Sequence, residues 1–181
     1  MTRRVTIERD LTLPAATLFH LRRAIQTEVG VREATHALHE AGFAAGEDFF
    51  QGFAREIGAD PAALTEAVFW QELDRYFDAR GWGRLEQERI HPAFGFLRAR
   101  SWGESNPTLN GDEELGCAFS AGVFAYILGR VGGGPIAVLE AGCRSRGDDE
   151  CSFLVGSEGA IQSAYGHLLS GDALDAALAR I

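Results

Sequence analysis

Three cysteines and one glutamate in the second half of the sequence have the types and spacing of metal ligands. The stretch EAGCRSRGDDEC, residues 140–151, carries Glu140, Cys143 and Cys151, and the chain has only one other cysteine, Cys117. If residues 146–148 form the turn of a hairpin, Cys143 lies opposite Cys151 and both thiols point to one face. Three thiols and one carboxylate supply the four ligands that a closed zinc site needs.

The surroundings of these residues fit a metal site under two conditions. Glu140 is three residues before Cys143, so strict strand alternation would point it to the opposite face unless Gly142 allows a bulge. Cys117 is expected to begin a helix, where free backbone N–H groups favour a thiolate. Arg144 and Arg146 are near enough in sequence to offset the remaining negative charge.

The spacing alone leaves other interpretations open. Buried free thiols explain the cysteines as well as a metal site does, because cysteine is often buried for packing. A disulfide between Cys143 and Cys151 is less expected, since three cysteines cannot all pair within one chain, which suits a reducing compartment. A catalytic cysteine is expected least, because no histidine is marked as its base. Haem ligation by His36 or His39 is less expected than an ordinary helix surface.

The elements that must position these residues follow from the hydrophobic periodicity. Helices are expected over 13–30, over 31–58 with breaks at glycines, and over 60–83 with Asp60 as N-cap and Pro61 at the first helical position. Strands are expected over 84–92, 94–102, 136–142 and 151–155, a loop over 105–115, and helices over 117–131 and 159–181. This order indicates a single α+β domain over 1–181, an antiparallel sheet packed with helices, with residues 1–80 mainly helical and 81–181 holding the sheet and the metal site.

Composition and charge narrow the classes of function. The chain of 181 residues has a net charge of −9 and no basic cluster, which argues against nucleic acid as a partner. The N-terminus lacks the apolar stretch of a secretory signal, and the longest apolar run, 117–129, is too short for a membrane span. We therefore expect a cytoplasmic protein. The scattered carboxylates form no recognisable acid–base pair and no dinucleotide fingerprint is present, so we expect a binding domain rather than an enzyme.

The hairpin and its spacing, Cys-x22-Glu-x2-Cys-x7-Cys, resemble those of the 4-vinyl-reductase (V4R) domain family, which includes sensor domains of bacterial activators that respond to aromatics. The resemblance implies zinc bound by Cys117, Glu140, Cys143 and Cys151. It also implies a fold shared with vesicle-tethering subunits and haem nitric-oxide sensors. The family habit and the long apolar stretch over 13–53 together predict a homodimer built from the N-terminal helices.

Aromatic residues in the expected central helix, strand and post-Cys117 helix are candidates for a ligand site, because the family binds apolar molecules between sheet and helices. A filled core explains the same rings nearly as well. The candidate ligand-binding residues are Trp70, Phe94, Phe96, Phe124 and Tyr126.

The leading functional hypothesis is a zinc-stabilised sensor or carrier domain for an apolar or aromatic small molecule. Its signal would pass to a separate protein. One alternative is a part in reducing the vinyl group of a tetrapyrrole in (bacterio)chlorophyll synthesis. The other is a protein-interaction or assembly module.

Overall fold

The protein is described here by a computed structural model that places residues 11–105, 116–172 and 174–181. One antiparallel sheet has the strand order β1-β2-β4-β3. Its strands are β1 (Arg84–His91), β2 (Phe94–Arg100), β3 (Ala137–Gly142) and β4 (Cys151–Gly156). The expected α+β class and the four expected strands are therefore confirmed. The loop expected over 105–115 lies, apart from Ser105, outside the described residues.

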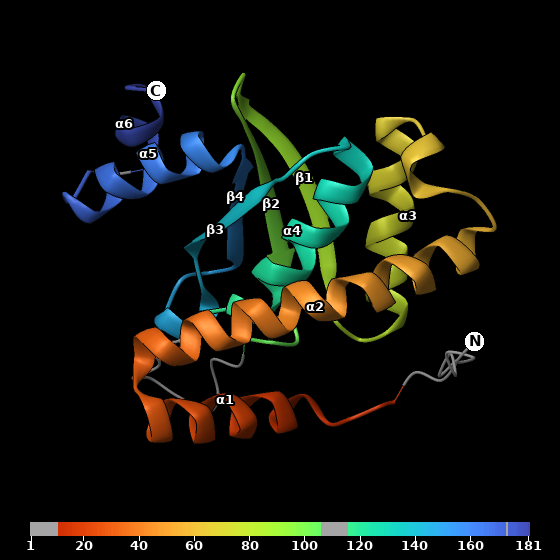
Figure 1. Cartoon of the computed structure of the whole chain (residues 1–181), viewed down its shortest axis with the longest axis horizontal. Helices are drawn as coiled ribbons and strands as arrows, with labels where there is room; N and C mark the ends of the chain where they lie inside the picture. The colour runs from red at the N-terminus through yellow and green to blue at the C-terminus, as the bar shows by residue number, and fades with distance from the viewer. Residues whose placement is uncertain (1–10, 106–115, 173) are drawn as a thin grey trace, which may run out of the picture.

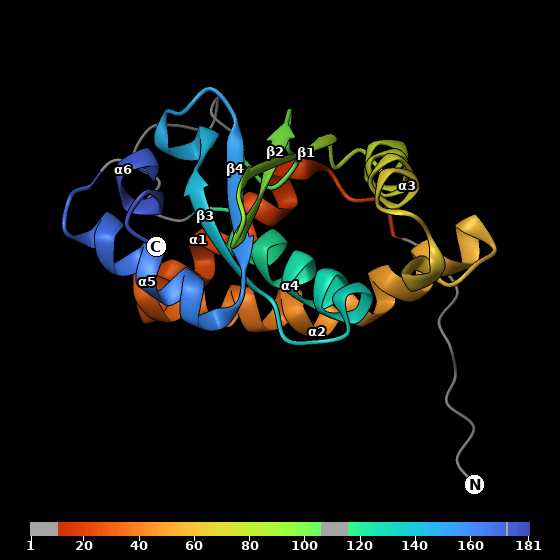
Figure 2. The same ribbon diagram turned by 90° about the horizontal axis from the view of Figure 1, so that it is seen from above.

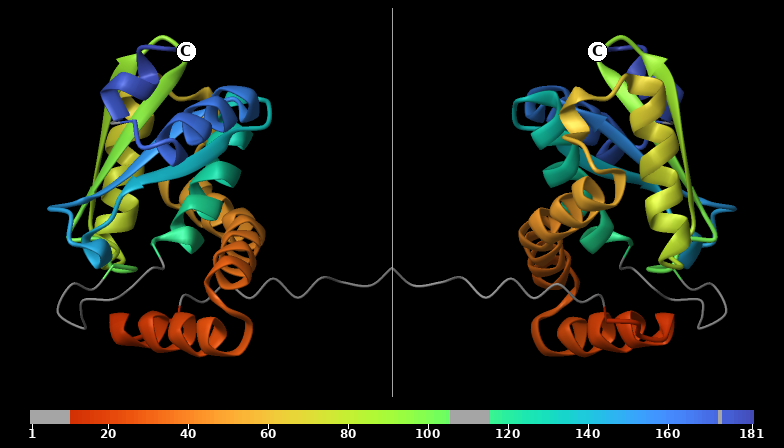
Figure 3. Two further views of the ribbon diagram at one scale, coloured as in Figure 1. Left: turned by 90° about the vertical axis from the view of Figure 1, so that its left-hand side faces the viewer. Right: turned by 90° about the vertical axis from the view of Figure 1, so that its right-hand side faces the viewer.

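Helices cover both faces of this sheet (Figures 1 and 2). They are α1 (Ala15–Val29), α2 (Val31–Ile57), α3 (Glu66–Ala79), α4 (Ala118–Gly132), α5 (Glu158–Leu169) and α6 (Leu174–Leu178). Figure 3 shows α1 on the far side of α2 from the sheet. No helix in the described part of the chain combines the length and apolar character that a membrane span requires.

The sheet separates two hydrophobic clusters. On one face, Leu97 and Phe153 pack in the main core with side chains of α2, α3 and α4. On the other face, Phe94 and Phe96 pack in a smaller cluster that includes Ile161 of α5 and residues of α6. The arrangement is therefore three layers, with strand alternation sending neighbouring residues of β2 into different cores.

The helices differ from the expectation in three ways. Asp60 caps a short 3-10 turn, Pro61–Ala63, and α3 begins only at Glu66. The C-terminal segment forms two helices, because Gly171 adopts a φ of +88° that ends α5. The third difference is that α2 is not broken by its glycines and runs without interruption.

The glycines of α2 and α4 allow these two helices to approach closely. A Cβ on Gly42 would lie 2.0 Å from the Phe119 carbonyl oxygen, and one on Gly122 would lie 2.1 Å from the His39 carbonyl oxygen. A Cβ on Gly46 would lie 2.4 Å from the Cβ of Tyr126. Glycine therefore costs helix propensity in α2 but permits a backbone contact that no other residue allows.

We expect Gly122→Ala to destabilise the protein by about 1–3 kcal/mol, because the added methyl group meets the rigid backbone of α2. Gly166→Ala in α5 is the matched control, since a Cβ there has nothing within 4 Å. The control should stabilise by up to about 1 kcal/mol through helix propensity. Urea unfolding of both variants measures the difference, and equal stabilities would contradict the close-packing explanation.

Candidate metal centre and the adjoining aromatic cavity

Three elements bring the cysteines together. Cys117 is the N-cap residue of α4, Cys143 directly follows β3, and Cys151 begins β4. The turn between the two strands is longer than expected, because Arg144–Arg146 form a 3-10 turn after Cys143. All three thiols are nevertheless fully buried and face one another.

The distances between the sulfur atoms match those of a thiolate metal site. Cys117 Sγ lies 3.7 Å from Cys143 Sγ and 3.6 Å from Cys151 Sγ, and the latter two are 3.8 Å apart. A tetrahedral ion with metal–sulfur bonds of about 2.3 Å places its sulfurs about 3.8 Å apart. The separations exclude disulfides in this structure.

Glu140 reaches the same point because β3 contains the bulge that Gly142 was expected to allow. Glu140 pairs with Phe153 and Gly142 pairs with Ser152, so one strand has an extra residue between these pairs. One ligand atom from each of Glu140 and the three cysteines lies within 4.8 Å of the others. The expected four-residue set is thus brought together, and it could hold a metal ion.

Neighbouring groups hold the carboxylate of Glu140 in place. Its Oε1 accepts a hydrogen bond of 2.7 Å from the backbone N–H of Cys117, and its Oε2 lies 3.0 Å from Arg146. A Cβ on Gly116 would lie 1.5 Å from Oε2, so only glycine leaves room for this carboxylate. Across the group, Asp148 accepts a hydrogen bond of 2.6 Å from the backbone N–H of Cys143.

Burial and mutual contacts shift the pKa values of three groups in this cluster in different directions. Burial raises the pKa of Glu140 to about 8, and the thiol of Cys143 adds to this effect. Hydrogen bonds from Cys117 and Cys143 lower the pKa of the Cys151 thiol to about 3, while the contacts with its two partners raise the pKa of Cys117. The raised pKa values of Cys117 and Glu140 oppose the ionisation of these two groups, whereas the lowered pKa of Cys151 favours its thiolate. A divalent cation would remove that opposition, because it stabilises every deprotonated ligand.

The five aromatic residues expected to line a ligand site are not brought together. Phe94 and Phe96 face α5 and α6 across the sheet from α4. Trp70 is half-buried at the edge of the main core, and Tyr126 contacts Phe43 of α2. Phe124 alone among the five lines the cavity described next.

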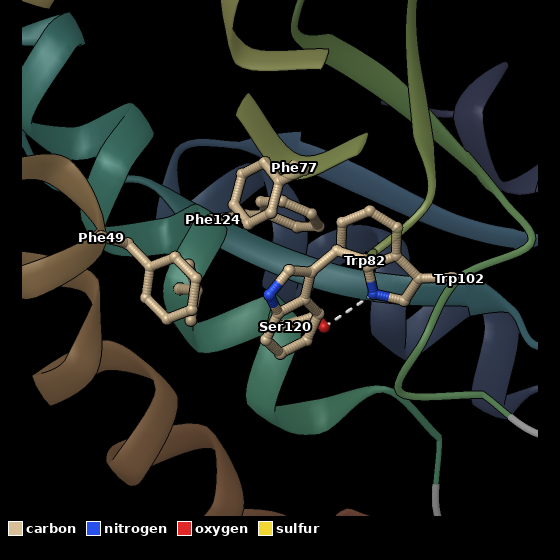
Figure 4. Close-up of a pocket in the computed structure, with 7 residues that line it drawn as sticks. Phe49, Phe77, Trp82, Trp102, Ser120 and Phe124 are labelled. Carbon is tan, nitrogen blue, oxygen red and sulfur yellow. Dashed lines mark hydrogen bonds between the residues drawn. The ribbon is translucent and has the colours of Figure 1, made fainter. Parts of the chain in front are cut away.

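Aromatic side chains pack closely around a small pocket beside the first turns of α4, called the aromatic cavity below (Figure 4). The Phe124 ring centroid lies 5.7 Å from that of Phe77 and 5.5 Å from that of Trp102. The half-buried rings of Phe49 and Trp82 close its outer side, 5.7 Å apart. The lining side chains leave no space for a water molecule between them. They are Phe49, Phe77, Trp82, Trp102, Ser120, Val123 and Phe124.

The polar end of this cavity is formed by buried residues that the sequence analysis did not select. Ser120 and Glu104 are 2% and 1% exposed. Glu104 accepts hydrogen bonds from the backbone N–H groups of Phe119 and Ser120 at 3.1 and 2.8 Å, and so caps α4 from outside the helix. Burial raises the pKa of Glu104 to about 7, against the opposing effects of Arg22 and Ser120.

Arg22 connects this polar end to α1. Its guanidinium donates hydrogen bonds to the carbonyl oxygens of Glu104 and Gly116, at 2.6 and 2.8 Å. A serine in the first turn of an otherwise apolar helix was the available signal for this site. Glu104 and Arg22 lack such a signal, because their partners are 16 and 82 residues away in sequence.

Comparison with known proteins identifies the segment that contains the metal cluster. Residues 107–157 match the V4R domain. The resemblance predicted from the cysteine hairpin is therefore confirmed, and the V4R segment includes all four candidate ligands. No curated protein sequence matches the chain.

Solved structures with the same fold extend beyond the V4R segment. The phenol-responsive sensory domain of the transcription activator PoxR, solved with phenol, aligns with a TM-score of 0.68, 16% identity, and coverage of 82% of this chain and 77% of that chain. Trafficking protein particle complex subunit 3 from Naegleria fowleri, covalently bound to palmitic acid, aligns with a TM-score of 0.61 and 15% identity. The alignment covers 78% of this chain and 91% of that chain. A vinyl-4-reductase family protein from Methanocaldococcus jannaschii aligns with a TM-score of 0.50 and 22% identity. The alignment covers 82% of this chain and 83% of that chain. These likenesses establish the fold.

We expect Cys143→Ser to lose bound metal and several kcal/mol of unfolding free energy, because metal binding at a structural site contributes directly to folding. Ser145→Ala is the control in the same turn, since that buried hydroxyl has no hydrogen-bond partner among the described residues. Elemental analysis and urea unfolding of protein purified without chelator measure both effects. Equal metal content and stability in the two variants would show that the cysteines are ordinary buried thiols.

Proposed function

We propose that this protein is a non-enzymatic sensor or carrier domain that binds a small apolar or aromatic molecule and is stabilised by zinc. The observation that carries the proposal is the aromatic cavity beside the metal cluster, with a single buried hydroxyl at its polar end. The PoxR sensory domain, which has the same fold, was solved with phenol. A cytoplasmic location and a separate protein that receives the signal remain predictions.

Zinc is the metal that fits the ligand set best. Three buried cysteines provide soft thiolate ligands and one carboxylate provides a fourth ligand, which is the number that closes a tetrahedral site. The ion would be held by Cys117, Glu140, Cys143 and Cys151. It would tie the start of α4 to the end of β3 and the start of β4. With no open position, its role would be structural.

The cavity would admit a ligand only after a ring moves, because its side chains are in contact in this structure. The outer rings of Phe49 and Trp82 are the candidates, since both are half-buried. Phe124 is the residue shared by this cavity and the site expected from sequence. The closed packing also favours a second candidate, an interaction or assembly module whose aromatic residues simply fill the core.

The ligand hypothesis predicts that phenol, indole or naphthalene raises the melting temperature, because a molecule that binds only the folded state stabilises it by mass action. Phe49→Ala should change the affinity for these probes by enlarging the outer side of the cavity. Phe96→Ala, on the opposite face of the sheet, is the control and should cost about 3–5 kcal/mol without changing probe preference. If no probe shifts the melting temperature of any variant, the filled-core alternative holds.

We also propose a homodimer formed through the N-terminal helices. Leu21 of α1 and Phe43 of α2 are large apolar side chains on neighbouring helices, and they are 54% and 44% exposed. A two-fold contact would cover the same residues on both chains.

The dimer predicts that a glutamate at either position weakens association, because it places a charge in an apolar interface. Sedimentation at micromolar concentration should show a dimer that Phe43→Glu converts to monomer. Leu169→Glu in α5, at a side chain 70% exposed, is the control and should leave the dimer intact. A wild-type mass of 19.6 kDa in solution would contradict the proposal.

A further inference from the structure

The hydroxyl of Ser120 is the polar group at the inner end of the aromatic cavity, and most of its hydrogen-bonding capacity is already used. Its Oγ donates a hydrogen bond of 2.5 Å to Oε2 of Glu104. The indole N–H of Trp102 donates to the same Oγ at 2.8 Å (Figure 4). Among the described residues, these are the hydrogen bonds of this hydroxyl.

A hydroxyl has one proton to donate and two lone pairs that accept. The proton of Ser120 is committed to Glu104, and one lone pair is occupied by Trp102. One lone pair therefore remains, on a residue that lines the cavity. A polar atom of a ligand that meets Ser120 must bring its own hydrogen.

Glu104 keeps the serine proton in this position. Its two oxygens accept from three donors of α4, two backbone N–H groups and the hydroxyl, which is the pattern of a carboxylate. Because its side chain is 1% exposed, no bulk water competes for these bonds. Above the pKa of about 7 that burial gives Glu104, the charge of this carboxylate beside Ser120 also opposes entry of an anionic ligand.

We propose that the polar end of the cavity selects neutral aromatic molecules that carry a hydrogen-bond donor, with Ser120 as the specificity-determining acceptor and Glu104 as the residue that positions its proton. This inference rests on the proposed ligand binding at the same cavity and deepens it. The ligand class is defined by one feature, an N–H or O–H group on an apolar ring system. Ethers and carboxylates of the same shape are excluded, because they would place an acceptor or a charge against a lone pair.

Three bicyclic compounds of nearly equal shape separate hydrogen bonding from size. Indole carries an N–H donor, benzofuran carries an acceptor oxygen, and indene carries neither. Titration calorimetry at about pH 8.5, above the pKa of about 7 that burial gives Glu104, keeps that carboxylate charged. The wild-type protein should bind indole about tenfold more tightly than indene, and benzofuran no better than indene.

Ser120→Ala should reverse this preference. The variant removes the acceptor and leaves the N–H of Trp102 without a partner, so the cavity end changes from an acceptor to a donor. Benzofuran should then bind at least as tightly as indole. Ser145→Ala is the matched control, because it removes a buried serine hydroxyl that does not line the cavity and leaves Ser120 unchanged.

The comparison remains decisive if Ser120→Ala does not fold, because the wild-type protein alone ranks the three compounds. Equal affinities for indole, indene and benzofuran in the wild type would overturn the inference while leaving ligand binding intact. Loss of the preference for indole in Ser145→Ala would show that the preference does not depend on Ser120, and would overturn the inference too. If none of the three binds, the proposed function itself fails for such ligands, and the inference fails with it.

Discussion

The backbone N–H groups at the start of α4 have no hydrogen-bond acceptor within the helix. Two carboxyl groups from elsewhere in the chain accept their hydrogen bonds. Glu140 takes the N–H of Cys117, and Glu104 takes those of Phe119 and Ser120. The helix dipole makes this end favourable for negative charge, which offsets part of the cost of burying both groups. Each carboxylate then has a second role, one in the metal cluster and one at the polar end of the cavity.

This shared helix end links the two candidate sites physically. Cys117 is three residues before Ser120, so the position of the thiol and that of the hydroxyl depend on the same turn of backbone. A metal at the cluster would fix the start of α4 relative to β3 and β4. The orientation of Ser120, and therefore the hydrogen bond that it offers, would depend on that fixed position. A structural metal can in this way matter for a binding site that it does not touch.

The sequence predicts the metal cluster better than the ligand site, and the reason is the range of the interactions. Two of the cysteines and Glu140 belong to one hairpin, and the bulge at Gly142 that aligns them is a local property of β3. Strand alternation correctly places Phe94 and Phe96 on one face, but it does not state which helices cover that face. The covering helices are α5 and α6, so the expected site is divided by the sheet.

Glycines in α2 illustrate the same limit. In isolation they lower helix propensity and predict interruptions, whereas in the fold they are required where α2 meets α4. Close packing between two helices is a property of the pair, so neither helix alone reveals it. The local pattern of a residue can therefore be interpreted correctly while its packing partner, in a third layer or on a neighbouring helix, stays unknown.

The attachment of α1 completes the arrangement around α4. The buried residues of α1 are Phe19 and Arg22, so this helix contributes little to the apolar core. Arg22 instead donates to the carbonyl oxygens of Glu104 and Gly116, the residues on either side of the segment that leads into α4. A guanidinium in this position holds both ends of that segment at a fixed separation, because its two N–H groups are rigidly spaced. A helix with little apolar packing of its own is thus held by Arg22 to residues beside both candidate sites.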